Sequence, residues 1–183
     1  TMKAYADAWL GTSSPLGTDS VTLSPYLGFE SLRPALDAAT ANQRGTFVLA
    51  LTSNPEGKSV QHVGKAEDTG AVAKQVIAAA TAENTAQTWE RMGSCGLVVG
   101  ATVGEALKEL AIDLSTFNGP ILSPGYGAQG ASAEDLYRIF AGVESQVLVN
   151  SSRGVLSAGP QLADLARAAQ SARDDLVRAR GTS

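Results

Sequence analysis

"GPILSPGYGAQGASAEDLYRIF", residues 119–140, contains the pattern that decides the fold. A short apolar segment leads into a glycine-rich loop, and a stretch with helical spacing of apolar residues follows that loop. This order predicts one strand–loop–helix unit. Within the loop, Gly125, Gly127 and Gly130 have the spacing G-x-G-x-x-G, which raises the hypothesis of a bound dinucleotide.

The same order recurs along the chain and gives five strand–loop–helix units behind a leading helix at residues 2–10. Each unit combines a β-branched or apolar run, a turn-rich loop and a helical pattern. The strands with their loops are predicted at 20–29, 45–54, 96–102, 119–127 and 145–154, and the helices at 30–42, 70–92, 104–112, 132–142 and 159–180.

The predicted strands are nearly continuous apolar runs with little polar alternation, which is typical of parallel strands covered by helices. The sequence therefore predicts an α/β fold with a parallel sheet, either doubly wound or barrel-shaped. A (β/α)8 TIM barrel takes roughly 250 residues. Five units behind a leading helix would be its last five βα units, so we expect residues 1–183 to form a single, incomplete TIM-barrel domain. Thr1 precedes Met2, and we expect part of the domain to lie upstream.

Composition excludes several classes of protein. The 14 basic and 18 acidic residues give a net charge of −4 without a basic cluster, which argues against nucleic-acid binding. With Cys95 and His62 as the only residues of their types, a disulfide framework, a His/Cys zinc site and a Ser-His-Asp triad are nearly excluded. Cys95 is expected to be a buried apolar residue at a strand start. No run has the length of a membrane span and no signal-peptide pattern is present, so we expect no membrane partner and a cytoplasmic protein.

The dinucleotide hypothesis for the glycine loop fails on its surroundings. A dinucleotide site needs an acidic residue about 20 positions later to bind the ribose. The next strand ends instead at Asn150, and only one further strand follows the loop. A dinucleotide-dependent oxidoreductase is therefore disfavoured.

A second loop, "NSSRGVLSAG" at residues 150–159, supplies an alternative. In barrel enzymes the loops after the last two strands commonly form a phosphate site. Glycine N–H groups can approach a phosphate closely, the Gln129 side chain can donate to it, and the Arg153 guanidinium can bind two of its oxygens. The two loops together predict a site for the phosphate of one nucleotide. The other interpretation, in which the glycines only turn the chain and Gln129 and Arg153 are surface residues, stays open.

Four motifs, each after a predicted strand, carry a resemblance to a known family: "LTSNPEG", "VVGAT", "LSPGYGAQGA" and "NSSRGV". In this order the sequence resembles orotidine 5′-phosphate decarboxylase, most closely one bacterial branch of that family. The resemblance implies a TIM-barrel lyase of de novo pyrimidine biosynthesis that converts orotidine monophosphate to uridine monophosphate. It also implies a homodimer with sites at the subunit interface, and a reaction that uses neither a metal nor an organic cofactor.

The resemblance also implies roles for individual residues. Gln129 would belong to the mobile loop that closes over the phosphate, and Arg153 would hold the phosphate together with the backbone at Ser152 and Gly154.

At the pyrimidine, Ser53 would hydrogen-bond the ring and Pro124 would lie against the base. Each has a structural alternative, because Ser53 can cap the turn of "SNPEG" and Pro124 can shape the end of a strand.

The family's catalytic signature, Asp-x-Lys-x-x-Asp-x-x-x-Thr, is represented in this chain only by Thr1, which would be its last residue and bind substrate. We therefore expect no catalytic residue in this chain, a missing N-terminal segment of the same enzyme as its partner, and no activity of the chain alone. Lys58, Lys65 and His62 are expected to be solvated loop residues. The alternative is a non-catalytic phosphate- or nucleotide-binding half barrel.

Overall fold

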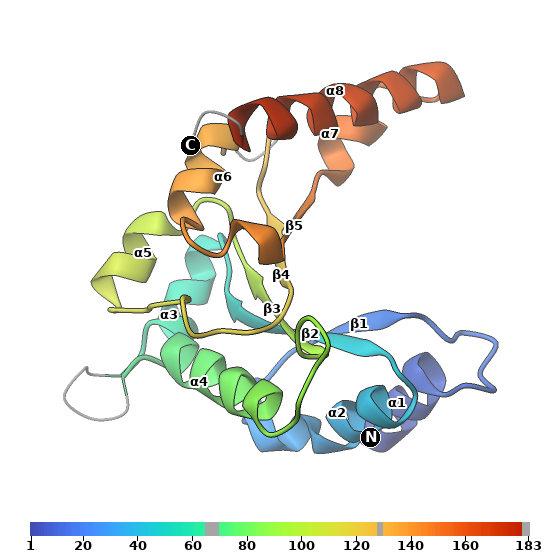
Figure 1. The fold of residues 1–183 in the computed structure, drawn as a ribbon, viewed down its shortest axis with the longest axis vertical. Helices are drawn as coiled ribbons and strands as arrows, with labels where there is room; N and C mark the ends of the chain where they lie inside the picture. Colours follow the sequence, from blue (N-terminus) through green and yellow to red (C-terminus); the bar gives the residue numbers. More distant parts are fainter. Residues whose placement is uncertain (65–69, 128–129, 181–183) are drawn as a thin grey trace.

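The fold was analysed in a computed structural model that describes residues 1–64, 70–127 and 130–180 (Figure 1). The strands form one sheet with the order β1-β2-β3-β4-β5, and every neighbouring pair is parallel. This confirms the predicted parallel α/β arrangement. The strands are β1 (Ser20–Leu23), β2 (Gly45–Leu51), β3 (Cys95–Val99), β4 (Ile121–Pro124) and β5 (Val147–Asn150).

Helices connect consecutive strands, as parallel pairing requires. Figure 1 shows α1, α2 and α4 on one side of the sheet and α6, α7 and α8 grouped near β5. The α-helices are α1 (Met2–Leu10), α2 (Arg33–Ala41), α3 (Lys58–Gln61), α4 (Val72–Thr85), α5 (Gly104–Glu109), α6 (Ala133–Ile139), α7 (Ser152–Leu156) and α8 (Leu162–Arg180). Short 3-10 helices are η1 (Phe29–Leu32), η2 (Pro55–Gly57) and η3 (Glu144–Gln146).

Burial follows the position of a strand in the sheet. All five residues of β3, the central strand, are buried, and Cys95 at its start is among them as predicted. On β5, an edge strand, partly buried and exposed residues alternate, and Leu148 is 52% exposed. Among the described residues β1 and β5 each pair with one strand only, so the sheet has two open edges.

The predicted helix at residues 70–92 is too long, because α4 ends at Thr85. The Asn84 side chain is held in the core by the backbone of Cys95, and the Trp89 Nε1 donates to the Asn84 carbonyl at 2.8 Å. These contacts turn the chain away from the helix axis, although the next residues would tolerate a helix. Two segments expected to be loops also contain helices: η2 and α3 lie between β2 and α4, and α7 follows β5.

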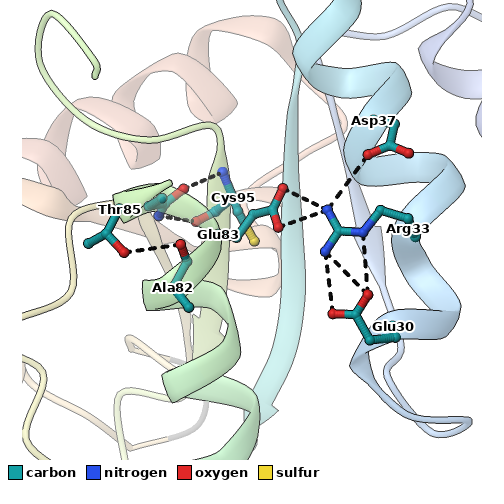
Figure 2. Close-up of polar contacts among 8 residues, drawn as sticks. Glu30, Arg33, Asp37, Ala82, Glu83, Thr85 and Cys95 are labelled. Carbon is teal, nitrogen blue, oxygen red and sulfur yellow. Dashed lines mark hydrogen bonds and ion pairs between the residues drawn. The ribbon is translucent and has the colours of Figure 1, made fainter. Parts of the chain in front are cut away.

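An ion-pair cluster joins two of the helices that cover the sheet (Figure 2). The Arg33 Nη1 on α2 donates to both carboxylate oxygens of Glu83 on α4, at 2.8 and 3.0 Å. Glu30 and Asp37 pair with the same guanidinium from its own side. The cluster fixes the spacing of α2 and α4 over β2, which both helices contact.

Candidate functional site

The candidate site lies at the carboxyl edge of the sheet, where the loops after parallel strands meet. β4 and β5 are neighbours, and Pro124 pairs in register with Asn150. The glycine loop and the Ser-Ser-Arg-Gly segment therefore start side by side. A phosphate site shared by the two loops, as the sequence predicts, requires these segments to lie next to each other, and the structure places them so.

A small cavity of about 110 Å³ lies between the two segments. Its walls combine the last residue of each strand with the first residues after it. They are Pro124, Gly125, Tyr126, Asn150, Ser151, Ser152 and Arg153.

The glycine loop has a backbone conformation that requires glycine. Gly125, Gly127 and Gly130 have φ values of +116°, +70° and +98°, in the left-handed region that side chains disfavour. The Gly127 N–H donates to the Ala131 carbonyl at 2.9 Å, and the Ala131 N–H donates to the Gly125 carbonyl at 3.3 Å. These two bonds close the stem of the loop. Gln129 lies outside the described residues.

Arg153 lies in the first turn of α7 rather than in an irregular loop, and its side chain is exposed. The first N–H groups of a helix have no acceptor within the helix and can donate to an anion. Ser152, Arg153 and Gly154 supply those groups here. A Cβ at Gly154 would lie 2.6 Å from the Ser151 Oγ, so glycine lets the chain turn tightly.

Backbone bonds align the carboxyl ends of β2, β3 and β4. The Gly100 N–H donates to the Leu51 carbonyl at 2.9 Å, and the Ala101 N–H donates to the Pro124 carbonyl at 2.8 Å. A Cβ at Gly100 would lie only 3.1 Å from the Ser53 backbone nitrogen, so glycine allows the two loops to approach. Ser53 and Pro124 therefore lie on the same edge of the sheet as the cavity.

Gln61 on α3 supports the turn that carries Ser53, and sequence reasoning missed it. The Thr52 N–H donates to Gln61 Oε1 at 2.9 Å, and Gln61 Nε2 donates to the Thr52 Oγ1 at 3.0 Å. Both polar groups of the amide are thus bonded to the residue before Ser53. No spacing in the sequence indicates this pair, because Thr52 and Gln61 come together only when the chain turns between β2 and α3.

Thr1 lies away from the cavity, on the side of the sheet where β1 is the edge strand, whereas the cavity lies beside β4 and β5. It precedes α1, which packs against α2 and β1, whereas Arg153 follows β5. The C-terminal end of α1 is fixed near the start of β2, where Asn42 Nδ2 donates to the Leu10 carbonyl at 2.7 Å. The structure brings Pro124, Ser152 and Arg153 together and does not bring Thr1 to them.

The remaining candidate groups do not form a second site. Cys95 lies at the amino end of β3, away from the cavity, and burial raises the pKa of its thiol to about 12. Within residues 1–64, 70–127 and 130–180, no three His, Cys, Asp or Glu side chains are grouped so that they could hold a metal ion. Over the same ranges no helix is long and apolar enough to cross a membrane.

Comparison with known proteins identifies the family to which the chain belongs. The model of the Orotidine 5′-phosphate decarboxylase / HUMPS family matches residues 1–168. The chain belongs to this family. The predicted resemblance is thereby confirmed.

Curated relatives in the family carry the name of the decarboxylase. The chain is 47% identical over 173 residues to orotidine 5′-phosphate decarboxylase of Streptomyces coelicolor, and 50% identical over 169 residues to that of Salinispora arenicola. Each match covers 92% of this chain and 58% of the relative. The chain thus spans somewhat more than half the length of these relatives.

Solved structures of the family agree with the fold. A protein of Streptomyces avermitilis assigned as orotidine 5′-phosphate decarboxylase superposes with a TM-score of 0.87 at 47% identity, over 97% of this chain and 60% of that one. OMP decarboxylase of Leishmania donovani gives 0.73 at 26% identity, over 98% and 63%. The chain supplies five βα units of the family's TIM barrel, as the sequence predicted.

Proposed function

We propose that this chain is the C-terminal portion of an enzyme that decarboxylates orotidine 5′-monophosphate to uridine 5′-monophosphate in de novo pyrimidine biosynthesis. The observation that carries the proposal is the register of Pro124 with Asn150, which sets the glycine loop and the Arg153 turn around one cavity. The names of the relatives at 47–50% identity support the reaction.

In this proposal the cavity holds the phosphate of the nucleotide. The N–H groups of Ser152, Arg153 and Gly154 donate to it from the first turn of α7, and the Arg153 guanidinium adds a charged donor. Gln129, which lies outside the described residues, has the role that the resemblance gives it, closing over the phosphate. The binding energy of the phosphate, remote from the reacting carbon, stabilises the transition state when the loop closes.

Ser53 and Pro124 contact the pyrimidine in the proposal. Both lie at the carboxyl edge of the sheet, at the ends of β2 and β4, from which they can reach a base whose phosphate is bound beyond β4 and β5. A hydrogen bond from Ser53 to the ring strengthens as negative charge builds up during loss of carbon dioxide.

The catalytic lysine and aspartates are proposed to lie in a segment that precedes Thr1. The additional length of the relatives leaves room for such a segment. The lysine would protonate the carbanion left at the pyrimidine C6. Residues 1–183 would then be one part of a single barrel domain, in a cytoplasmic homodimer in which Thr1 contributes to a substrate site.

Arg153→Ala in the complete enzyme tests the phosphate site. Because a hydrogen bond to a charged group contributes roughly 1.5–3 kcal/mol, we expect the affinity for uridine monophosphate to fall about ten- to a hundredfold. The affinity for uridine, which has no phosphate, should be unchanged. Isothermal titration with both ligands measures the two values.

Arg167→Ala is the matched control, because Arg167 is an exposed arginine on α8 that pairs with Asp164 of the same helix. It should bind both ligands as the unmodified enzyme does. Equal losses of nucleotide and nucleoside in Arg153→Ala would contradict the proposed phosphate site. Nucleotide binding without any turnover by the complete enzyme would instead support a non-catalytic binding protein.

A further inference from the structure

Tyr126 in the glycine loop reaches across to the last helix. Its hydroxyl donates to Asp175 Oδ2 on α8 at 2.7 Å, although the two residues are far apart in the sequence. Asp175 also lies 3.5 Å from an Arg178 Nη1, one turn later on the helix. None of the roles assigned above uses this contact.

The Tyr126 hydroxyl is a hydrogen-bond donor at neutral pH. Burial, together with the hydrogen bond to Asp175, raises the pKa of Tyr126 to about 12. The phenol therefore stays protonated around neutral pH. The Asp175 carboxylate accepts a charge-assisted hydrogen bond from it.

Tyr126 also lies at the stem of the loop. It forms a parallel bridge with Ala131, made by the two backbone bonds that involve Gly125 and Gly127. A contact that fixes the Tyr126 side chain therefore also fixes the loop stem, which consists of residues 125–127 and Ala131.

The helix that receives this bond touches the other half of the site as well. α8 packs against α6 and α7 (Figure 1). Arg153 lies on α7. A cavity of about 470 Å³ separates α8 from the rim of the site, lined by Gly127, Ser151 and Gly154 on one side and by Ala168, Ser171 and Asp175 on the other. Tyr126 and Asp175 both line this cavity.

We propose that the Tyr126–Asp175 hydrogen bond is a strut that holds the stem of the phosphate loop against α8, so that both side chains are positioning residues for the phosphate. The inference rests on the proposed function of the cavity. With the strut in place, the stem of the glycine loop and the N–H groups on α7 keep one relative position. Without it, the nucleotide has to order the loop stem on binding, which lowers its affinity.

The test uses the complete enzyme with Tyr126→Phe, Asp175→Ala and the double variant. We expect each single variant to weaken uridine monophosphate binding and to raise KM for orotidine monophosphate by about tenfold, the effect of losing one charge-assisted hydrogen bond. The affinity for uridine, which has no phosphate, should change by less than about twofold. The double variant should be no weaker than either single variant, because all three lack the same bond.

Asp175→Asn keeps an acceptor oxygen for the phenol and should largely restore binding. The matched controls are Tyr137→Phe and Asp174→Ala. Tyr137 lies on α6, and within the described part of the chain its hydroxyl makes no hydrogen bond. Asp174 is the neighbour of Asp175 and pairs with Arg173 on α8. Both controls should bind nucleotide normally.

Hydrogen exchange of the Gly127 and Ala131 amides provides a readout that does not depend on the ligand. Tyr126→Phe should speed exchange at these two amides and leave the amides of β3 unchanged. Unchanged exchange together with unchanged nucleotide affinity would overturn the strut. Equal losses of nucleotide and nucleoside affinity would also overturn it, because they indicate general damage to the fold. If the unmodified enzyme bound no nucleotide, the proposed function would fail, and the exchange result would still decide whether the strut exists.

Discussion

At the scale of single residues, the buried side chain of Asn84 holds the start of β3. The Asn84 side chain is 1% exposed. Asn84 Nδ2 donates to the Cys95 carbonyl at 2.8 Å, and the Cys95 N–H donates to Asn84 Oδ1 at 3.1 Å. Gly93 and Gly119 enclose the amide so closely that a Cβ at either would lie within 2.0 or 2.5 Å of its polar atoms. The amide thus acts as an additional strand partner at the start of β3.

We expect Asn84→Ala to lower the free energy of unfolding by about 2–4 kcal/mol, because it leaves two buried backbone groups without a partner. Urea unfolding followed by circular dichroism measures the change. Asn118→Ala, at an exposed asparagine, is the control and should cost less than about 0.5 kcal/mol. A similar small loss for Asn84→Ala would show that water replaces the amide in the core.

Sequence reasoning predicted residues whose role depends on near neighbours. Ser132 and Asp135 form a capping box at the start of α6, and the bond from the Ser132 N–H lowers the pKa of the Asp135 carboxyl. A serine followed three residues later by an acidic residue, at the start of the helix predicted at 132–142, is a local pattern that predicts such a cap, and the structure confirms it. Asn84, Gln61 and the pair of Tyr126 with Asp175 were missed, because their partners come from segments that only the folded chain brings together.

At the scale of elements, Arg33 and Glu83 join α2 to α4 away from full solvent exposure. The Glu83 side chain is 17% exposed, and the Arg33 side chain is 37% exposed. Removing the guanidinium would leave a largely buried carboxylate with less compensation. This contact therefore differs from ion pairs on the open surface, which contribute little.

We expect Arg33→Ala to lower the free energy of unfolding by about 1.5–3 kcal/mol, because the lost hydrogen bonds are to a charged and mostly buried group. Arg138→Ala removes an exposed ion pair with Asp135 and should cost at most about 1 kcal/mol. Urea unfolding of the two variants gives the comparison. Equal effects would mean that the α2–α4 contact is no stronger than a surface pair.

The predicted elements were most accurate where a local pattern decides the structure. Apolar runs identified all five strands of the described chain, since each strand is a short β-branched or apolar segment between turns. The end of α4 was missed because a tertiary contact decides it. Asn84 bonds to the backbone of Cys95, and the helix ends there although the residues that follow have the propensity to continue it. α7 was missed because it has five residues and includes Gly154, so neither length nor apolar spacing indicates a helix.

At the scale of the whole molecule, the five-stranded sheet has open edges at β1 and β5 within the described residues. Leu148 on β5, Leu156 on α7 and Leu162 on α8 are exposed near one of these edges. Unpaired edge strands with apolar neighbours favour association with another chain segment. The number of units could be read from the sequence, but no pattern in the sequence indicates what pairs with the two edges.

We expect the isolated chain to show no decarboxylase activity, and activity to appear when it is mixed or co-expressed with the proposed N-terminal segment. Without a cofactor the reaction needs a positioned ammonium at C6. The lysines of the described residues, Lys3, Lys58, Lys74 and Lys108, lie on helices and do not line the cavity, and Lys65 lies outside the described residues. The assay follows loss of orotidine monophosphate for each piece and for the mixture. Substantial activity of the chain alone would contradict the assignment of the lysine to the other segment. A well-folded mixture without activity would contradict the proposed decarboxylase function itself.

The order β1-β2-β3-β4-β5 also bears on how the molecule is made. Each strand pairs with the strand synthesised immediately before it, and no later strand has to insert between two that have already paired. A chain leaving the ribosome can therefore extend its sheet one unit at a time, with the loop-closure entropy of each step limited to the segment between two consecutive strands. β4 and β5, which bear the proposed phosphate site, are then the last strands of the five to be added.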